Sequence, residues 1–220
     1  MNATQNILVR NLFQQAKPFL KMRNDFIHTR VSHGYALLLL EKEGGDRRIV
    51  EPAIILHDIG WSALKPEDIA HAYGLKATGA KARKLNRIHE VQGAVIAKKI
   101  LSKQGYDTAT IQQVVQIIKR HDSGNNPDTT EEKLVKDADK LWRFSKIGYP
   151  YELQRQASTH TARHTFLSQN IDSWFFTRTA KALAKKELMK IDYLIIFLSV
   201  GIILLGLGAG GAIPADEPEV

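Results

Sequence analysis

The sequence contains no cysteine among its 220 residues. This absence excludes disulfide bonds and thiolate metal sites, and it leaves the redox compartment undetermined. Any bound metal ion would therefore be held by His, Asp and Glu side chains. The sequence also lacks a convincing strand-like alternation of apolar and polar residues, an internal repeat and a low-complexity tract. We therefore expect an all-α protein.

A secretory signal is also missing, because the N-terminus MNATQNILVRNLFQQ has neither a charged leader nor a short apolar core. We therefore expect that the first domain is not secreted. The length is enough for one domain with a sizeable core, plus an appendage. The net charge of +8 and the pI of about 9.6 favour anionic partners such as phosphate esters, nucleic acid or a membrane surface.

A long uncharged run, Tyr193 to Ile213, lies near the C-terminus and is about as long as a bilayer-spanning helix. Lysines precede it and acidic residues follow it, which predicts a cytoplasmic domain and an acidic tail outside. The alternative is a buried helix, which the Gly-rich second half disfavours at about 1 kcal/mol per glycine. We predict that a transmembrane helix, residues 191–213, anchors the protein to the inner face of the cell membrane, followed by a tail, residues 214–220.

Apolar residues at helical spacing predict a series of helices before this run. We expect them over residues 3–19, 26–42, 47–57, 65–73, 87–104, 108–121 and 131–147, with one or two more up to residue 190. Turn-forming residues predict loops over 74–84 and 123–130. We predict an N-terminal helix, residues 1–22, that packs on a domain of residues 23–190 with a helical C-terminal extension.

The stretch Ala53–Leu64, AIILHDIGWSAL, places His57 and Asp58 directly after an apolar run. Ionisable groups in such a place lie at the wall of the core, where an unpaired group is costly. A single metal ion can satisfy both residues. Because consecutive helical residues point about 100° apart, that ion would lie in a cleft between helices. The alternative is that each residue has its own hydrogen-bond partner.

Four more candidate ligands, His28, His89, His121 and Asp139, lie in other predicted helices. The intervals between successive sites are 29, 31, 32 and 18 residues; the first three each fit about one helix–loop–helix step, and the last fits a tighter one. Such steps can bring one or two residues per helix to a common interior point. Six nitrogen and oxygen ligands suit a pair of divalent ions such as Fe, Mn or Zn, with Mg also compatible, better than a closed structural zinc site.

This H…HD…H…H…D pattern resembles the HD-domain superfamily of metal-dependent phosphohydrolases. The resemblance is carried by HTRV, ILHDIG, HEVQGAVIAKKIL, IIKRHD and VKDADKL, and it extends over about residues 23–143. It implies an HD-domain helical bundle and the following ligands. His28, His57, Asp58 and Asp139 would hold one ion, and His89 and His121 would hold a second ion that Asp58 bridges to the first.

Asp137 is an alternative to Asp139 as the last ligand. We prefer Asp139, because the aspartate of the family commonly precedes a basic residue and Leu, as in Asp139-Lys140-Leu141. The resemblance further implies hydrolysis of a phosphomonoester or phosphodiester, with a small anionic substrate, most naturally a nucleotide. A metal-activated hydroxide would attack phosphorus.

Nearby cations would stabilise the charge that develops on the phosphoryl group. The candidates near the ligands are Lys84, Arg87, Arg120, Lys136, Lys140 and Arg143. The alternative for each is a solvated surface charge; Arg87 and Lys140 are the preferred pair. Asp122, which follows His121, is a candidate proton acceptor or an orienting partner of that imidazole.

Two departures from the family pattern bear on the reaction. Many members have Lys after HD-x-G, notably the related oxygenases and the cyclic-dinucleotide phosphodiesterases, whereas this chain has Trp61. The Gly-Tyr-Pro signature of the latter enzymes precedes the last aspartate, whereas Gly148-Tyr149-Pro150 follows Asp139 and is expected to be a turn. These departures make both an oxygenase and a cyclic-dinucleotide phosphodiesterase less favoured interpretations. The alternatives that remain are a membrane-tethered nucleotide- or metal-binding regulatory module without turnover and a diiron oxygenase of the same fold.

The remaining histidines and the aromatic residues have simpler interpretations. His160 and His164 lie four apart on a predicted helix and could share a metal ion, but the sequence shows no third ligand. His33 and His71 are expected at the surface or in packing. The core is expected to contain Trp142, Phe144, Trp174, Phe175 and Phe176. These aromatic residues are not interleaved with a basic strand pattern, so no specific nucleic-acid partner is expected.

Overall fold

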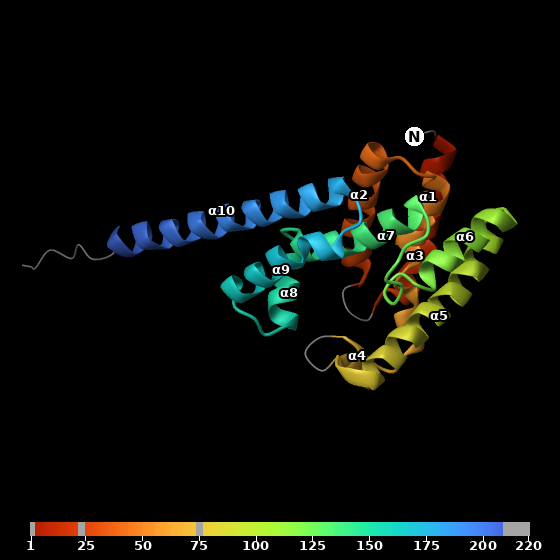
Figure 1. The fold of residues 1–220 in the computed structure, drawn as a ribbon, viewed down its shortest axis with the longest axis horizontal. Helices are drawn as coiled ribbons and strands as arrows, with labels where there is room; N and C mark the ends of the chain where they lie inside the picture. Colours follow the sequence, from red (N-terminus) through yellow and green to blue (C-terminus); the bar gives the residue numbers. More distant parts are fainter. Residues whose placement is uncertain (1–2, 22–24, 74–76, 209–220) are drawn as a thin grey trace, which may run out of the picture.

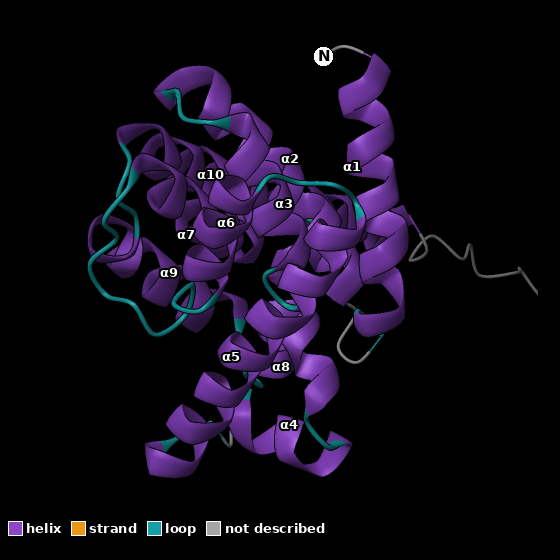
Figure 2. Ribbon diagram, turned by 90° about the vertical axis from the view of Figure 1, so that its right-hand side faces the viewer, coloured by secondary structure: helices purple, strands orange, loops and turns teal. Residues whose placement is uncertain are grey.

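A computed structural model of the chain describes residues 3–21, 25–73 and 77–208, and it describes side chains over residues 5–21, 25–73 and 77–193. Within these ranges all regular secondary structure is helical and no strand is present (Figure 2). The prediction of an all-α protein is therefore confirmed. The α-helices are α1 (Ala3–Ala16), α2 (Asp25–Glu43), α3 (Arg47–Leu56), α4 (Pro66–Ala72), α5 (Gly79–Lys103), α6 (Thr108–Ile118), α7 (Thr130–Leu141), α8 (Gly148–Arg155), α9 (His160–Trp174) and α10 (Arg178–Gly208).

Three short 3₁₀ helices connect some of these elements in the described chain. They are η1 (Lys17–Phe19), η2 (Ile59–Ala63) and η3 (Trp142–Phe144). Aspartate side chains cap the N-termini of two helices. Asp46 accepts a hydrogen bond from the Arg48 amide at the start of α3, and Asp107 accepts one from the Thr110 amide at the start of α6. Such N-caps satisfy amides that have no partner inside the helix.

Helix α3 is the centre of the bundle. It contacts α1, α2, α6 and α7, and every residue from Ile49 to Leu56 is buried. A helix that is buried on all sides must be surrounded by other elements of the fold. Because α3 ends inside the core, His57 and Asp58, which follow it directly, are delivered to the interior of the molecule (Figure 1).

A close backbone contact sets the distance between α5 and η2. A Cβ atom added at Gly60 would lie 1.9 Å from the carbonyl oxygen of His89 and 2.8 Å from the Cα atom of Gly93. Only glycine allows this approach, because any side chain at position 60 would push α5 away. The contact brings His89 beside the His57-Asp58 pair.

Several predicted boundaries were wrong. The segment 74–84 was predicted as a loop, but α5 begins at Gly79, which places His89 in the third turn of the helix instead of the first. The polar composition of this stretch hides Ala82, which is buried, and Leu85 just after the stretch is buried against residues of η2 and α4. In addition, α6 ends at Ile118, so His121 lies in a turn, and the predicted helix 131–147 ends as α7 at Leu141.

The C-terminal part of the chain packs on the same bundle and then leaves it. Helix α8 contacts η3 and α9, and α10 contacts α9, α7 and α2. Beyond these contacts α10 extends away from the other helices (Figure 1). Among the residues whose side chains are described, no helix is long and apolar enough to cross a membrane. The predicted span 191–213 and the tail 214–220 lie almost entirely outside those residues.

Candidate metal centre

All the predicted ligands meet at one point in the bundle, although they are far apart in the sequence. His28 comes from α2, His57 and Asp58 from the end of α3, His89 from α5, His121 from the turn after α6, and Asp139 from α7. All except His28 are buried, and His28 is nearly so, with a side chain 12% exposed. The geometry divides these residues into two groups.

The first group consists of His28, His57 and Asp139, together with one oxygen of Asp58. The Nε2 atom of His28 lies 3.0 Å from Asp139 Oδ1 and 3.0 Å from His57 Nε2. Asp58 Oδ2 lies 3.4 Å from the Nε2 atom of each of these two histidines. The four side chains thus direct four donor atoms at one small volume.

The second group consists of His89, His121 and Asp122, together with the other oxygen of Asp58. The two Nε2 atoms lie 3.2 Å apart, and Asp58 Oδ1 lies 3.8 Å from His89 Nε2 and 3.7 Å from His121 Nε2. Asp122 Oδ2 lies 3.7 Å from His89 Nε2. Asp58 therefore faces the two groups with different oxygens, which is the arrangement that a bridging carboxylate requires.

Two of the histidines have a defined orientation. The Nδ1 atom of His57 lies 2.8 Å from the carbonyl oxygen of Ile54, and His121 Nδ1 lies 2.8 Å from that of Ile118. A carbonyl only accepts hydrogen bonds, so each Nδ1 carries the hydrogen and each neutral ring presents the Nε2 lone pair to the cluster. Within each group two Nε2 atoms lie only 3.0 or 3.2 Å apart, and two lone pairs at such a distance require a proton or a cation between them.

The charges of the cluster also fit a cation. Burial opposes protonation of His57, but Asp58 and Asp139 outweigh it and raise the pKa of His57 to about 9. For Asp139, burial opposes ionisation, but His28 and His57 outweigh it and hold its pKa well below the usual range. The carboxylates that favour a proton on His57 also favour a metal cation in place of that proton, and imidazoles together with carboxylates form a donor set that fits divalent cations of the Fe, Mn or Zn type. The residues present therefore fit the metal that the sequence predicts.

Asp137, the alternative to Asp139, has other partners. Its two oxygens accept hydrogen bonds from the amides of Phe176 and Thr177, at 2.9 and 2.8 Å, and from the Thr177 hydroxyl at 2.7 Å. It is fully buried and joins α7 to the start of α10. Of the two aspartates, only Asp139 lies among the histidines.

Trp61 contacts the second group of the cluster. Its indole Nε1 donates a hydrogen bond to Asp58 Oδ1 at 2.9 Å, and its ring stacks on the His89 ring with centroids 4.0 Å apart. A lysine at this position would offer a charge, whereas the indole offers one N–H group and a flat apolar face. The sequence pattern marked position 61 as unusual, but it did not reveal these contacts.

The turn that carries His121 and Asp122 is held from two sides. Glu90, which is fully buried, accepts hydrogen bonds from the amides of Asp122 and Ser123 at 3.0 and 2.8 Å. The Nζ atom of Lys136 donates to the carbonyl oxygen of His121 at 2.7 Å. Sequence reasoning missed Glu90, although a glutamate directly after a candidate ligand is a signal for an orienting residue.

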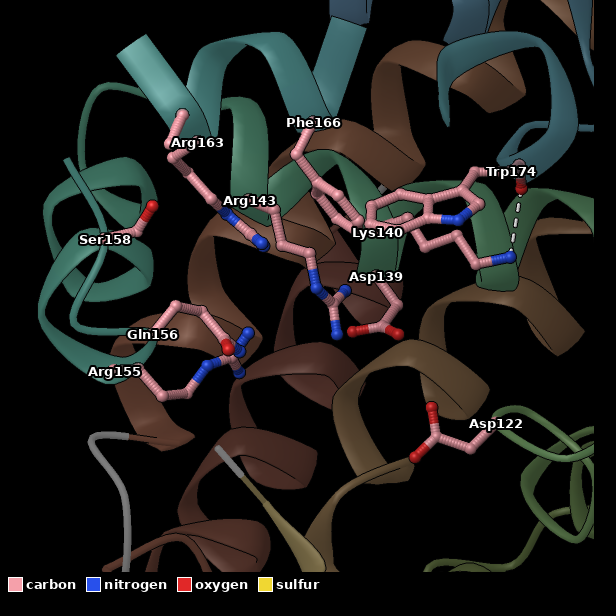
Figure 3. Close-up of a pocket in the computed structure, with 11 residues that line it drawn as sticks. Asp122, Asp139, Lys140, Arg143, Arg155, Gln156, Ser158, Arg163, Phe166 and Trp174 are labelled. Atoms are coloured by element: carbon pink, nitrogen blue, oxygen red, sulfur yellow. Dashed lines mark hydrogen bonds between the residues drawn. The ribbon is translucent and has the colours of Figure 1, made fainter. Parts of the chain in front are cut away.

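The preferred cations take different positions. Arg87 pairs with Glu90 at 3.0 Å, also contacts the Lys119 carbonyl, and is half exposed at the rim. The Nζ atom of Lys140 donates to the carbonyl oxygen of Trp174 at 2.9 Å. In Figure 3 Lys140 extends toward Trp174, whereas Arg143 extends toward the Asp139 carboxylate. Arg143 is therefore better placed than Lys140 to act at the cluster.

Two cavities open onto the centre. One of about 1040 Å³ is lined by residues that include His28, Asp58 and Trp61, and a second of about 580 Å³ lies next to it. The two cavities share Asp122, Asp139, Arg143, Arg155 and Gln156. Cavities of this size accommodate small organic molecules such as nucleotides.

Three of the remaining histidines have carboxylate partners away from the centre. His33 lies 3.0 Å from Glu51, and His160 and His164 lie 3.5 and 3.0 Å from different oxygens of Asp192 on α10. Asp192 is thus a third polar residue beside the His160–His164 pair, which the sequence did not suggest. The clusters that could hold a metal ion in the described chain nevertheless all belong to the centre described above.

Comparison with known proteins agrees with this geometry. A family model described as HD domain matches residues 25–143. A crystal structure described as that of a predicted HD superfamily hydrolase from an uncultured Thermotogales bacterium superimposes with a TM-score of 0.60 at 20% sequence identity, covering 90% of this chain and 98% of the other. This second likeness concerns the fold. No curated protein matches the chain.

Proposed function

Since the chain belongs to the HD-domain family, we propose that it is a metal-dependent phosphohydrolase that cleaves a phosphomonoester or phosphodiester, with a nucleotide as the favoured substrate. The observation that carries this proposal is the position of Asp58, whose two oxygens face two separate groups of histidines. One carboxylate between two sets of nitrogen ligands suits a pair of ions that share a substrate phosphoryl group.

His28, His57, Asp58 and Asp139 would hold one ion, and His89, His121 and Asp58 would hold the other. Such ions supply Lewis acidity toward a phosphoryl oxygen and lower the pKa of a coordinated water. Iron, manganese and zinc fit the mixed imidazole and carboxylate donors better than magnesium, which prefers oxygen ligands and retains several waters.

The other residues of the site orient groups and move a proton. Trp61 orients the shared carboxylate of Asp58 through its N–H group. Arg143, beside Asp139, places a fixed positive charge where a phosphoryl group gains negative charge. Asp122, whose side chain is 38% exposed at the mouth of the cluster, is placed to accept a proton and pass it to solvent.

The test is phosphate release by the full-length protein, loaded in turn with Mn²⁺, Fe²⁺ and Zn²⁺, on a panel of phosphomonoesters and phosphodiesters. We expect His57→Ala and Asp58→Ala to lower the rate by about 10³-fold or more, because several kcal/mol of transition-state stabilisation depend on the ions. His71→Ala on α4, which lies outside the cluster, is the matched control and should retain the rate.

Elemental analysis of the same samples separates this proposal from the alternatives. Bound metal with phosphate release supports the hydrolase. Bound metal and bound nucleotide without turnover on the whole panel would instead indicate a regulatory module. Oxygen consumption by the iron-loaded protein would indicate an oxygenase, and either result contradicts the proposal.

We further propose that residues 191–213 anchor the catalytic domain to the cytoplasmic face of a membrane. The support is in the sequence: the run from Tyr193 to Ile213 has no charged residue, and it follows a lysine-rich segment. The full chain should stay with the membrane fraction after a carbonate wash, and a chain that ends at residue 190 should be released. Release of the full chain by the wash contradicts this proposal.

A further inference from the structure

Three arginines gather around one buried carboxylate beside the metal centre. Glu152 on α8, with a side chain only 1% exposed, contacts the Nη2 atoms of Arg155 and Arg163, and its Oε1 lies 3.9 Å from Arg143 Nε. Arg155 and Arg163 lie beyond residue 143, where the match to the family ends. This arginine cluster (Arg143, Arg155 and Arg163) is therefore a feature of the C-terminal extension as much as of the HD domain.

The arginine cluster is not balanced by its own carboxylate. Arg143 also extends toward Asp139, so Arg155 and Arg163 against the single charge of Glu152 leave one excess positive charge. A guanidinium has five N–H donors and a carboxylate has about four acceptor positions, so Glu152 satisfies only a minority of the donors present. The Nε atoms of Arg155 and Arg163 are buried and have no hydrogen-bond partner in the described part of the chain.

A purely structural role would need fewer charges. One arginine on α9 is sufficient to tie that helix to α8 through Glu152, and each additional charge raises the cost of desolvation. The side chains are 22%, 15% and 8% exposed for Arg143, Arg155 and Arg163, so bulk water screens the excess charge only in part. A polyvalent anion would compensate it.

The cavity leads from the cluster of ligands to these arginines. The 580 Å³ cavity is lined by Asp139 and by the whole arginine cluster, and Arg143 and Arg155 also line the larger cavity. In Figure 3 Arg143 extends toward Asp139, while Arg155 and Arg163 lie farther from that carboxylate. Arg155 also contacts Tyr73, because its guanidinium carbon lies 4.0 Å from the centre of the Tyr73 ring.

We propose that Arg155 and Arg163 form a subsite for a second phosphate group, so that the substrate is a phosphoester with two or more phosphates, such as a nucleoside bisphosphate or polyphosphate. This inference rests on the proposed phosphohydrolase function. One phosphate lies at the Asp58 centre and the other at the arginine cluster, with Arg143 between them. Guanidinium groups suit this role because their paired N–H groups bind phosphate oxygens in a bidentate manner.

The test compares a nucleoside 5′-monophosphate, the matching 5′-diphosphate and the 3′,5′-bisphosphate as substrates of the full-length, metal-loaded protein. At least one of the two larger substrates should have a kcat/KM about 10- to 100-fold above that of the monophosphate, as charge-assisted hydrogen bonds provide. Arg155→Gln should remove most of this advantage, mainly through KM, and change the monophosphate less than about 3-fold. Arg155→Lys, which keeps the positive charge but lacks the paired N–H groups of a guanidinium, should retain part of the kcat/KM advantage of the larger substrates.

Arg48→Gln, which changes an exposed arginine on α3, is the matched control and should leave kcat/KM unchanged for all three substrates. Arg163→Gln tests the more buried arginine, with a melting curve to show that the variant is folded. An equal loss for all substrates in the Arg155 and Arg163 variants would overturn the subsite, because it indicates that these residues only support the fold through Glu152.

Calorimetric titration with inorganic pyrophosphate tests the subsite even if no phosphoester is hydrolysed. Binding to the full-length protein that is weakened about 10-fold or more by Arg155→Gln, but not by Arg48→Gln, supports the subsite on its own. If pyrophosphate binds the unmodified protein and the Arg155 variant equally, the subsite is wrong, whatever the outcome of the hydrolysis assays.

Discussion

The two halves of the candidate metal centre differ in how the chain supports them. His28, His57 and Asp139 extend from α2, α3 and α7, which pack against one another around the buried core. In the other half, His121 and Asp122 lie in a turn, and Asp122 is 38% exposed.

The same types of ligand are held by different means in the two halves. The first half is preorganised by helix packing, so its ligands lose little freedom when an ion binds. The second half depends on the partners that hold its turn, Glu90 and Lys136, and on the ring of Trp61 against His89. We therefore expect the first half to bind its ion more tightly.

The largest expected difference separates His28→Ala from His121→Ala. Loss of His28 should lower phosphate release by about 10³-fold and reduce metal content in both halves, because the shared Asp58 is then poorly placed. Loss of His121 should cost about 10²-fold and leave close to one ion per chain. Elemental analysis with activity assays checks both variants, and equal metal loss in the two would contradict the proposed difference between the halves.

A smaller effect is expected at Trp61. Trp61→Phe keeps an aromatic ring against His89 but removes the hydrogen bond to Asp58. Loss of an orienting partner typically costs about 10- to 100-fold in metal affinity or activity. Titration with Zn²⁺ should show the loss mainly in the weaker of two binding steps. An unchanged titration would show that the indole N–H does not support the second half.

A still smaller effect is expected at the exposed end of the second half. Asp122→Asn keeps a similar shape but removes a charge and a proton acceptor near His89. The rate should fall by about 10-fold, less than the roughly 10²- to 10⁴-fold typical of general acid–base catalysis, since solvent reaches this position and replaces part of the role of Asp122. Steady-state kinetics should show the change in kcat. A loss of a whole ion per chain would instead show that Asp122 is a ligand.

The smallest effect on activity is expected at Asp137, outside both halves. Asp137→Asn should leave metal content and turnover unchanged, but weaken the hydrogen bonds to Phe176 and Thr177 and lower stability by about 1–3 kcal/mol. Thermal unfolding with elemental analysis measures both quantities. Loss of metal in this variant would contradict the assignment of Asp139 as the ligand.

Much of the fold could be predicted from local patterns, although some helix ends could not. The start of α5 was missed because residues 79–84 are mostly small or charged, and their helical state depends on the burial of Ala82 and Leu85 against neighbouring elements. The end of α6 was placed too late because basic residues such as Lys119 and Arg120 are typical of a last helical turn, although the helix stops at Ile118.

By itself, the sequence determined the chemistry that is available: without cysteine, a metal site must use imidazoles and carboxylates, and their spacing assigned one or two to each helix. It also determined that the fold is helical, because apolar periodicity is a local property. Only the tertiary structure decided between Asp137 and Asp139, gave Trp61 and Glu90 their partners, and gathered Arg155 and Arg163 beside the centre. The physical reason is that a side chain's partners depend on which helices pack together and how closely, as at Gly60 and Gly93.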